Sequence, residues 1–107
     1  MNESEFLTLA ERTLDAIEGA VEACGADIEA TRAGGVLTLE LHDGSKIVIN
    51  SQTPMRQIWV AARGGGFHFG RTGDDWRDTR DQTELFAALS RLISAQGGQA
   101  IVLRPAR

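Results

Sequence analysis

The sequence predicts an α+β protein: a two-layer α/β sandwich in which two helices pack on one face of an antiparallel sheet of about six strands. Two observations lead to this fold class. Near both ends of the chain, apolar residues recur every three or four positions, as in amphipathic helices. Between these ends, apolar and polar residues alternate over short segments that are joined by short glycine-containing turns, which favours antiparallel strands.

The first helix is predicted over residues 4–23. Its apolar stripe consists of Phe6, Ala10, Leu14, Ile17 and Val21. Ser4 or Asn2 has the side-chain oxygen needed to cap the first turn. Gly25 follows the last periodic residue and suits the end of a helix.

Six strands are expected after this helix, over residues 27–32, 36–42, 46–51, 57–62, 67–70 and 76–78. Asp43 and Gly44 predict a two-residue hairpin turn between the second and third strands. The three glycines at 64–66 predict a flexible hairpin; without a following lysine and helix, they do not form a phosphate-binding loop.

The second helix is predicted over residues 84–95, where the 3.6-residue period returns. Its apolar stripe consists of Leu85, Phe86, Leu89, Leu92 and Ile93. Asp81 or Thr83 is the expected cap, and Gly97 and Gly98 end the helix. The apolar tail at 100–103 is expected to pack back onto the protein.

Composition limits the possible classes of protein. A chain of 107 residues fits one domain, here residues 1–107, and 42% apolar with 24% charged residues is ordinary for a folded protein. No apolar run approaches the ~20 residues that cross a bilayer, and the acidic start lacks the basic region of a signal peptide. With one cysteine, Cys24, no internal disulfide is possible, so we expect a cytoplasmic protein. No membrane partner is expected.

The charge is unevenly distributed along the chain. Residues 1–29 hold eight acids and one base, whereas the remaining residues hold seven acids and ten bases. Glu11, Asp15 and Glu18, together with Glu22, fall within an arc of about 60° on the first helix. Asp27 and Glu29 are expected to extend the same acidic patch. Nucleic acid is not expected as a partner for this surface, because phosphates would be repelled.

The acidic stripe has two interpretations. One is a solvated helix face that maintains solubility. The other is a shallow site for hard cations such as iron, because carboxylate oxygens attract them and the cation relieves the repulsion between like charges. Few protein ligands and much retained water would make such binding weak and exchangeable.

A second candidate surface follows from strand alternation. If Ile47, Ile49 and Ile58 face the helices, several polar and aromatic side chains face away from them. These are Asn50, Gln52, Gln57, Trp59 and His68. Tryptophan is enriched at binding hot spots, which indicates a docking surface. The alternative is that the tail or a loop covers Trp59, leaving it structural. No nucleophile, base and orienting group stand in a catalytic pattern, so an enzyme is not expected.

Residues 50–59 read N-x-Q-x-P-x-x-Q-I-W and resemble the signature of the frataxin family. The likeness extends over nearly the whole chain, including the opening residues 1–6, the segments 34–38, 43–49 and 65–69, and the second helix. The resemblance implies a non-enzymatic iron-binding protein that regulates or supplies iron for iron–sulfur cluster assembly. Its implied partners are a cysteine desulfurase and a scaffold protein.

By position, the resemblance implies weak Fe²⁺ or Fe³⁺ binding, with other divalent cations possible, at Glu11, Asp15, Glu18, Glu22, Asp27 and Glu29. It implies partner binding by Glu18, Glu22, Asn50, Gln52, Gln57, Trp59 and His68, in a monomer that iron can drive into oligomers. The sequence departs from enterobacterial relatives at Gly19 and Ala23, which stand where those proteins carry paired acids, so fewer or weaker iron sites are expected. Two alternatives stay open: a pure interaction module with incidental metal binding and, last in rank, a ferroxidase.

Overall fold

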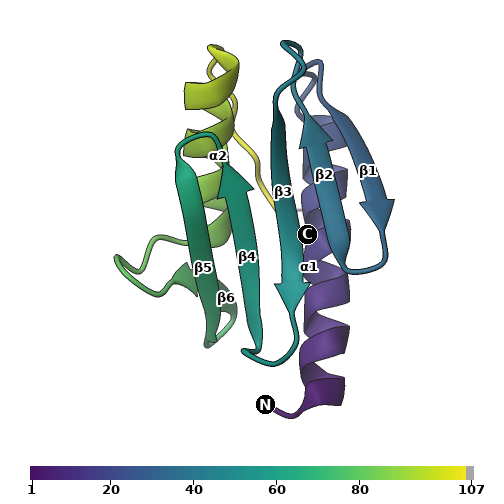
Figure 1. Ribbon diagram of the computed structural model, residues 1–107, viewed down its shortest axis with the longest axis vertical. Coiled ribbons are helices and arrows are strands. Elements are labelled where there is room, and N and C mark those ends of the chain that lie inside the picture. Colours follow the sequence, from purple (N-terminus) through teal and green to yellow (C-terminus); the bar gives the residue numbers. More distant parts are fainter. Residues whose placement is uncertain (106–107) are drawn as a thin grey trace.

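The six strands of this computed structural model form one antiparallel sheet whose spatial order is the sequence order, β1-β2-β3-β4-β5-β6 (Figure 1). The elements are α1 (Glu3–Ala23), β1 (Glu29–Ala33), β2 (Val36–Glu40), β3 (Lys46–Gln52), β4 (Gln57–Ala62), β5 (Gly65–Thr72), β6 (Asp75–Asp78) and α2 (Leu85–Gly97). The structure describes residues 1–105, so the last two residues of the predicted domain lie outside it. The predicted fold class is confirmed.

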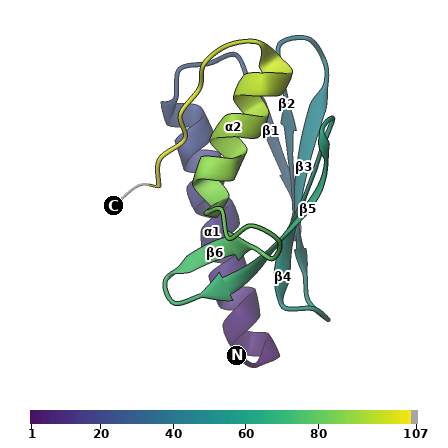
Figure 2. The same ribbon diagram turned by 90° about the vertical axis from the view of Figure 1, so that its left-hand side faces the viewer.

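Both helices lie on the same side of the sheet, and the other side is open (Figure 2). The core forms between these two layers. Strand register aligns Leu37, Ile49 and Val60 on the helix side, where each is at most 2% exposed. Because alternate residues of a strand point to opposite faces, the same strands also build the open face. Within residues 1–105, neither helix combines the length and hydrophobicity needed to cross a membrane.

Helix α1 begins one residue before the predicted start. Of the two expected caps, Asn2 takes the role: its side chain accepts from the Glu5 backbone N–H at 2.8 Å. The Glu5 carboxylate accepts in return from the Asn2 N–H at 2.9 Å, which completes a capping box. At the other end, Gly25 has a φ of +78° and turns the chain toward β1, as predicted.

Helix α2 is capped by a different residue from those expected. Glu84, not Asp81 or Thr83, is the N-cap, and its carboxylate accepts from the N–H groups of Phe86 and Ala87. The Asp81 carboxylate is held by the Thr83 N–H at 3.0 Å, so the Asp81 side chain closes the loop before the helix. The predicted stop is confirmed, because Gly98 adopts a φ of +72°.

Two hairpins differ in detail from the prediction. The β2–β3 loop is longer than a two-residue turn: Leu41 bonds to Ser45, and Gly44, with a φ of +85°, forms the bulge that closes it. Gly65 and Gly66 belong to β5, because they pair with Ala62 and Ala61. Three consecutive glycines do not show in the sequence where the turn ends and the strand begins. The first strand also begins at 29 rather than 27.

The C-terminal tail packs onto α2, as predicted, and two serines hold it there. The Ser94 hydroxyl accepts from the Ile101 N–H at 2.9 Å, and the Ser90 hydroxyl accepts from the Leu103 N–H at 2.8 Å. Both bonds position the apolar side chains of Ile101 and Leu103 in the core. The tail therefore lies on the helix side of the sheet and leaves the open face uncovered.

One buried hydrogen bond links helix α1 to the edge strand β6. Trp76 of β6 donates from its indole N–H to the Thr13 hydroxyl at 2.7 Å, and Thr13 donates in turn to the Leu9 carbonyl. Both side chains are almost inaccessible to water, so the indole N–H has no alternative partner in solvent.

We expect Thr13→Val to lower the free energy of unfolding by about 1–3 kcal/mol, because it leaves the buried Trp76 donor unpaired while keeping the side-chain volume. The measurement is urea unfolding followed by circular dichroism. Thr8→Val, at an exposed position of the same helix, is the control and should change the free energy by roughly 0.5 kcal/mol or less. Equal effects of the two substitutions would contradict the assigned bond.

Candidate functional site

The open face of the sheet carries the five polar and aromatic residues that strand alternation predicts for it. We call Asn50, Gln52, Gln57, Trp59 and His68 the platform. Strand register puts Asn50, Trp59 and His68 in one row across β3, β4 and β5, with Gln52 opposite Gln57 in a parallel row. Register therefore brings together residues that are up to 18 positions apart in the sequence.

Two contacts hold the Trp59 ring in place. It stacks on His68, with ring centroids 4.3 Å apart and an interplanar angle of 11°. Its indole N–H donates to the Gln57 side-chain oxygen at 2.8 Å. The side chain is half-buried, and it lines a shallow hollow on the open face. A large aromatic group that is already immobilised loses little conformational entropy when it binds a partner.

Asn50 carries a buried acceptor without a donor. Among residues 1–105, its Oδ1 atom makes no hydrogen bond, although it is shielded from water. It lies at a shallow hollow of about 180 Å³ that Trp59, His68 and Val48 also line. A buried polar atom left without a partner costs about 1–3 kcal/mol, so this position is not optimised for stability. Its oxygen becomes available to another molecule only if the Asn50 side chain rotates out of this buried position.

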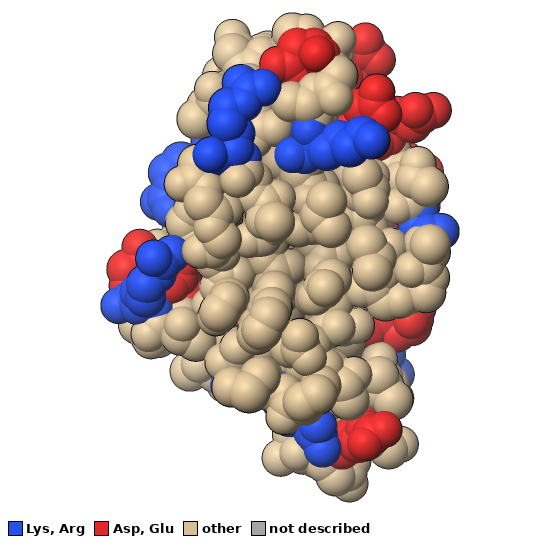
Figure 3. Space-filling model, viewed as in Figure 1, with Lys and Arg blue, Asp and Glu red and all other residues tan. Residues whose placement is uncertain are grey.

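Charged residues are sparse on the middle of this face. Figure 3 shows a broad surface without lysine, arginine, aspartate or glutamate, and the charged groups lie toward its margin. Register explains the pattern, because Glu40 and Lys46 face each other at one end of the sheet and Arg77 lies at the far edge strand. Depletion of charge around a central aromatic residue is characteristic of the core of a protein interface.

The acidic stripe consists of Glu11, Asp15, Glu18 and Glu22 on α1. A positively charged side chain of the neighbouring strand lies against it, a contact that the sequence did not lead us to predict. Arg32 of β1 donates to Asp15 at 2.8 Å and to Glu11, and lies 3.6 Å from the Glu18 carboxylate. A signal was available in the sequence, because alternation from Ala30 directs Arg32 toward the helix layer. Only 16% of the Arg32 side chain is exposed.

Electrostatics favour this arrangement. The hydrogen bond to Asp15, with the nearby carboxylates of Glu11 and Glu18, raises the pKa of Arg32 above its ordinary value despite partial burial. The guanidinium therefore stays charged throughout the physiological range. Arg32 offsets one of the four negative charges of the stripe and relieves the repulsion between neighbouring acids.

The remaining predicted metal ligands are dispersed. Glu22 and Asp27 are exposed, and no hydrogen bond or ion pair holds either carboxylate within residues 1–105. Glu29 pairs with Glu40 in the β1–β2 register, so its side chain points to the open face, away from α1. In the described part of the chain, no group of three or more histidine, cysteine, aspartate or glutamate side chains is placed to enclose a metal ion.

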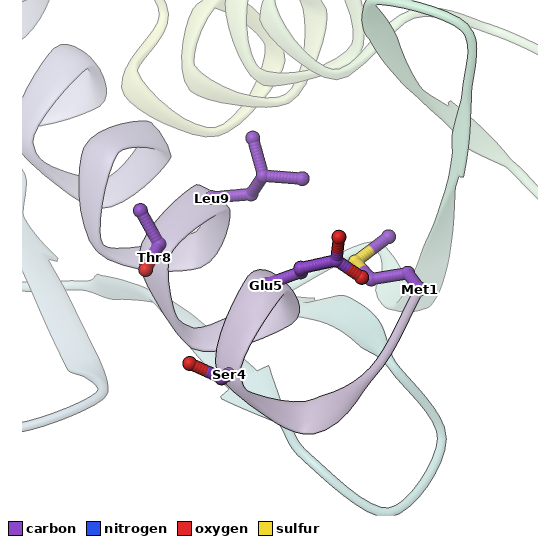
Figure 4. A pocket seen from close by; sticks show the side chains of 5 residues that line it. All are labelled: Met1, Ser4, Glu5, Thr8 and Leu9. Carbon is purple, nitrogen blue, oxygen red and sulfur yellow. The ribbon is translucent and has the colours of Figure 1, made fainter.

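A larger hollow lies at the first turns of α1, lined by Met1, Ser4, Glu5, Thr8 and Leu9 (Figure 4). Four of the side chains project from the first turns of the helix and Met1 precedes it, and the five do not converge on one point. Its one titratable side chain, Glu5, is engaged in the capping box. This hollow therefore offers no chemistry that competes with the platform or the stripe as the candidate site.

The same architecture occurs in proteins of known structure. Frataxin from Psychromonas ingrahamii matches with a TM-score of 0.89 and 35% identity, covering 95% of this chain and 97% of that one. A ferrous complex of trimeric frataxin from the yeast Saccharomyces cerevisiae matches with a TM-score of 0.66 and 28% identity, covering 92% and 88%. The fold is therefore of the frataxin type.

Sequence comparisons extend this likeness over almost the whole chain. A family model described as a frataxin-like domain matches residues 1–99. Several relatives carry the name iron-sulfur cluster assembly protein CyaY, and two of them show the extent of the likeness. The one from Herminiimonas arsenicoxydans is 55% identical and covers 99% of both chains; the one from Cupriavidus taiwanensis is 57% identical and covers 94% and 95%. The chain belongs to the frataxin (CyaY) family.

We expect Asn50→Val to raise the free energy of unfolding by about 1 kcal/mol, because it removes an unpaired buried acceptor and adds a β-branched residue to a central strand. Urea unfolding provides the measurement. Gln52→Val is the matched control, since Gln52 lies two residues further along the same strand and face and has no buried orphan atom among the described residues. A clear loss of stability in Asn50→Val would show that the Asn50 side chain supports the fold instead.

Proposed function

We propose that this protein is a non-enzymatic iron-binding component of iron–sulfur cluster assembly, which regulates the process or supplies iron to it. The observation that carries the proposal is the platform: an immobilised Trp59 beside an unpaired Asn50 acceptor, in the middle of a face whose charged side chains lie toward its margin. Relatives about 55% identical, named for iron–sulfur cluster assembly, supply the process. A yeast frataxin in a ferrous complex supports iron as the cargo.

The platform is proposed to dock onto the scaffold protein. Trp59 supplies the buried apolar area and His68 supports its ring, while Asn50, Gln52 and Gln57 provide donors and acceptors around it. Fixed aromatic groups surrounded by uncharged polar groups form the centre of many protein interfaces. On this account, docking requires no change in the backbone of the sheet.

The acidic edge is proposed to bind iron weakly and to contact a basic surface of the cysteine desulfurase. Its ligands are the stripe of α1 with Asp27, and Glu18 and Glu22 serve both roles. Carboxylate oxygens are suitable ligands for Fe²⁺ and Fe³⁺, and a convex helix surface leaves most of the hydration shell in place. Binding of this kind is fast and reversible, which suits delivery rather than storage. Glu29 is less suited, because it faces the other side of the sheet.

A ferroxidase is not favoured by any particular contact. Oxidation of Fe²⁺ at a useful rate generally needs several ligands fixed around an open coordination position. The stripe carboxylates are instead mostly exposed, and three of them point at Arg32.

Two variants separate the two surfaces. Trp59→Ala should weaken binding to the scaffold protein about 30-fold, the effect of losing an interface hot spot, and leave Fe²⁺ binding unchanged. The double variant Glu18→Gln, Glu22→Gln should weaken Fe²⁺ and desulfurase binding and leave the scaffold affinity unchanged. Isothermal titration calorimetry measures all three, with Fe²⁺ under anaerobic conditions.

Met55→Ala is the control for the platform variant, because Met55 is an exposed apolar residue outside the platform, in the turn between β3 and β4. It should leave all three affinities as they are. A folded Trp59→Ala protein that binds the scaffold normally would remove the platform from the proposal. Unchanged iron and desulfurase binding in the double variant would remove the acidic edge.

A further inference from the structure

Arg32 is fixed against the acidic stripe by several elements at once. Its backbone lies on β1, where it pairs with the buried Leu37, so strand alternation directs the side chain toward α1. Its Nε donates to the Gly34 carbonyl at 3.1 Å, and its two terminal nitrogens reach Asp15 and Glu11. The guanidinium is therefore anchored at both ends instead of moving freely over the surface.

This placement uses the carboxylate oxygens that a metal ion would need. Asp15 and Glu11 each direct an oxygen at the guanidinium, and a Glu18 oxygen lies 3.6 Å from it. A divalent cation entering between these side chains would meet a positive charge a few ångströms away. It would gain the carboxylates only by displacing Arg32 or by sharing them with it.

The other end of the acidic edge is free of this cation. Glu22 lies one turn beyond Glu18 on α1, and Asp27 lies in the connection to β1. Neither carboxylate has a hydrogen-bond or ion-pair partner within residues 1–105. The acidic edge is therefore divided into a half that is neutralised internally and a half that is open.

We propose that Arg32 is a built-in counter-ion that occupies the Glu11–Asp15–Glu18 half of the stripe and restricts cation binding to the Glu22–Asp27 end. This inference rests on the proposed iron-binding role of the acidic edge and names the residue that limits it. Arg32 acts as an internal competitor: it lowers the affinity for a free cation, and a partner that draws Arg32 away would raise that affinity.

The test compares Arg32→Gln with two other variants. Arg32→Lys keeps the charge at the same position. Arg12→Gln makes the same change in net charge but removes a base that lines a separate hollow beside Trp76. Each protein is titrated with Fe²⁺ under anaerobic conditions, with calorimetry for affinity and ¹H–¹⁵N spectra for the residues broadened by the paramagnetic ion.

Arg32→Gln should bind Fe²⁺ about tenfold more tightly than the wild type, the size expected when one positive charge a few ångströms from a divalent ion is removed in water. Arg12→Gln should change the affinity about twofold or less, because the Arg12 side chain projects from another face of α1, beside Trp76, and makes no ion pair with the stripe carboxylates among residues 1–105. Arg32→Lys should stay close to the wild type. Broadening should be confined to residues 21–28 in the wild type and should extend to residues 11–18 in Arg32→Gln.

Two results would overturn the inference while leaving the proposed iron binding intact. One is equal affinity in Arg32→Gln and Arg12→Gln; the other is wild-type broadening centred on Glu11 and Asp15. The wild-type map needs no variant, so it decides the question even if Arg32→Gln folds poorly. A wild type and an Arg32→Gln protein that both fail to bind Fe²⁺ would instead contradict the proposed function itself.

Discussion

The period-two alternation of side chains, combined with helices on only one face of the sheet, is the constraint on which the rest of this structure depends. Each central strand gives one set of side chains to the core and the other set to the open face. Ile49 faces the core and is buried, so its neighbour Asn50 faces outward. The same relation holds for Ile58 and Trp59. Packing and the candidate docking surface are therefore two consequences of one register, and a slip of one residue would destroy both.

The same alternation accounts for the division of the acidic edge. On β1, it sends Arg32 toward α1 and Glu29 toward the open face. One arginine then contacts three acids from successive turns of the helix, which offsets the repulsion that these acids cause in an isolated helix. Exposed ion pairs of this kind contribute roughly 0.2–1 kcal/mol each, so their main effect is on the affinity of the surface for other cations.

Sequence reasoning predicted the fold and the platform well, because both follow from periodicity over many residues. The alternation around Ile47, Ile49 and Ile58 was sufficient to place Trp59 on the open face, and register then brought His68 beside it. Details that depend on single side chains were less accessible. The capping role of Glu84, for example, depends on where the preceding loop places its carboxylate. From their spacing in the sequence, Asp81 and Thr83 were equally suitable candidates for the N-cap of α2.

The acidic edge was the least predictable part of the candidate site. A helical projection shows which acids share a face of α1, but it does not show what the neighbouring strand brings to them. Arg32 is 14 to 21 residues away from the three acids that it contacts. Only the pairing of β1 with β2 and the packing of the sheet on α1 bring these charges together. The stripe is thus a partly neutralised surface, although its sequence reads as purely acidic.

We propose that the open face of the sheet docks a protein, whereas the acidic edge along α1 binds a cation. The most direct measurement is the position of the Trp59 indole N–H signal in ¹H–¹⁵N spectra, first with anaerobic Fe²⁺ and then with the scaffold protein. We predict that Fe²⁺ broadens α1 signals and leaves the Trp59 indole unchanged, and that the scaffold then shifts the indole. An indole signal that is unaffected by the scaffold, or broadened by iron alone, would contradict this account.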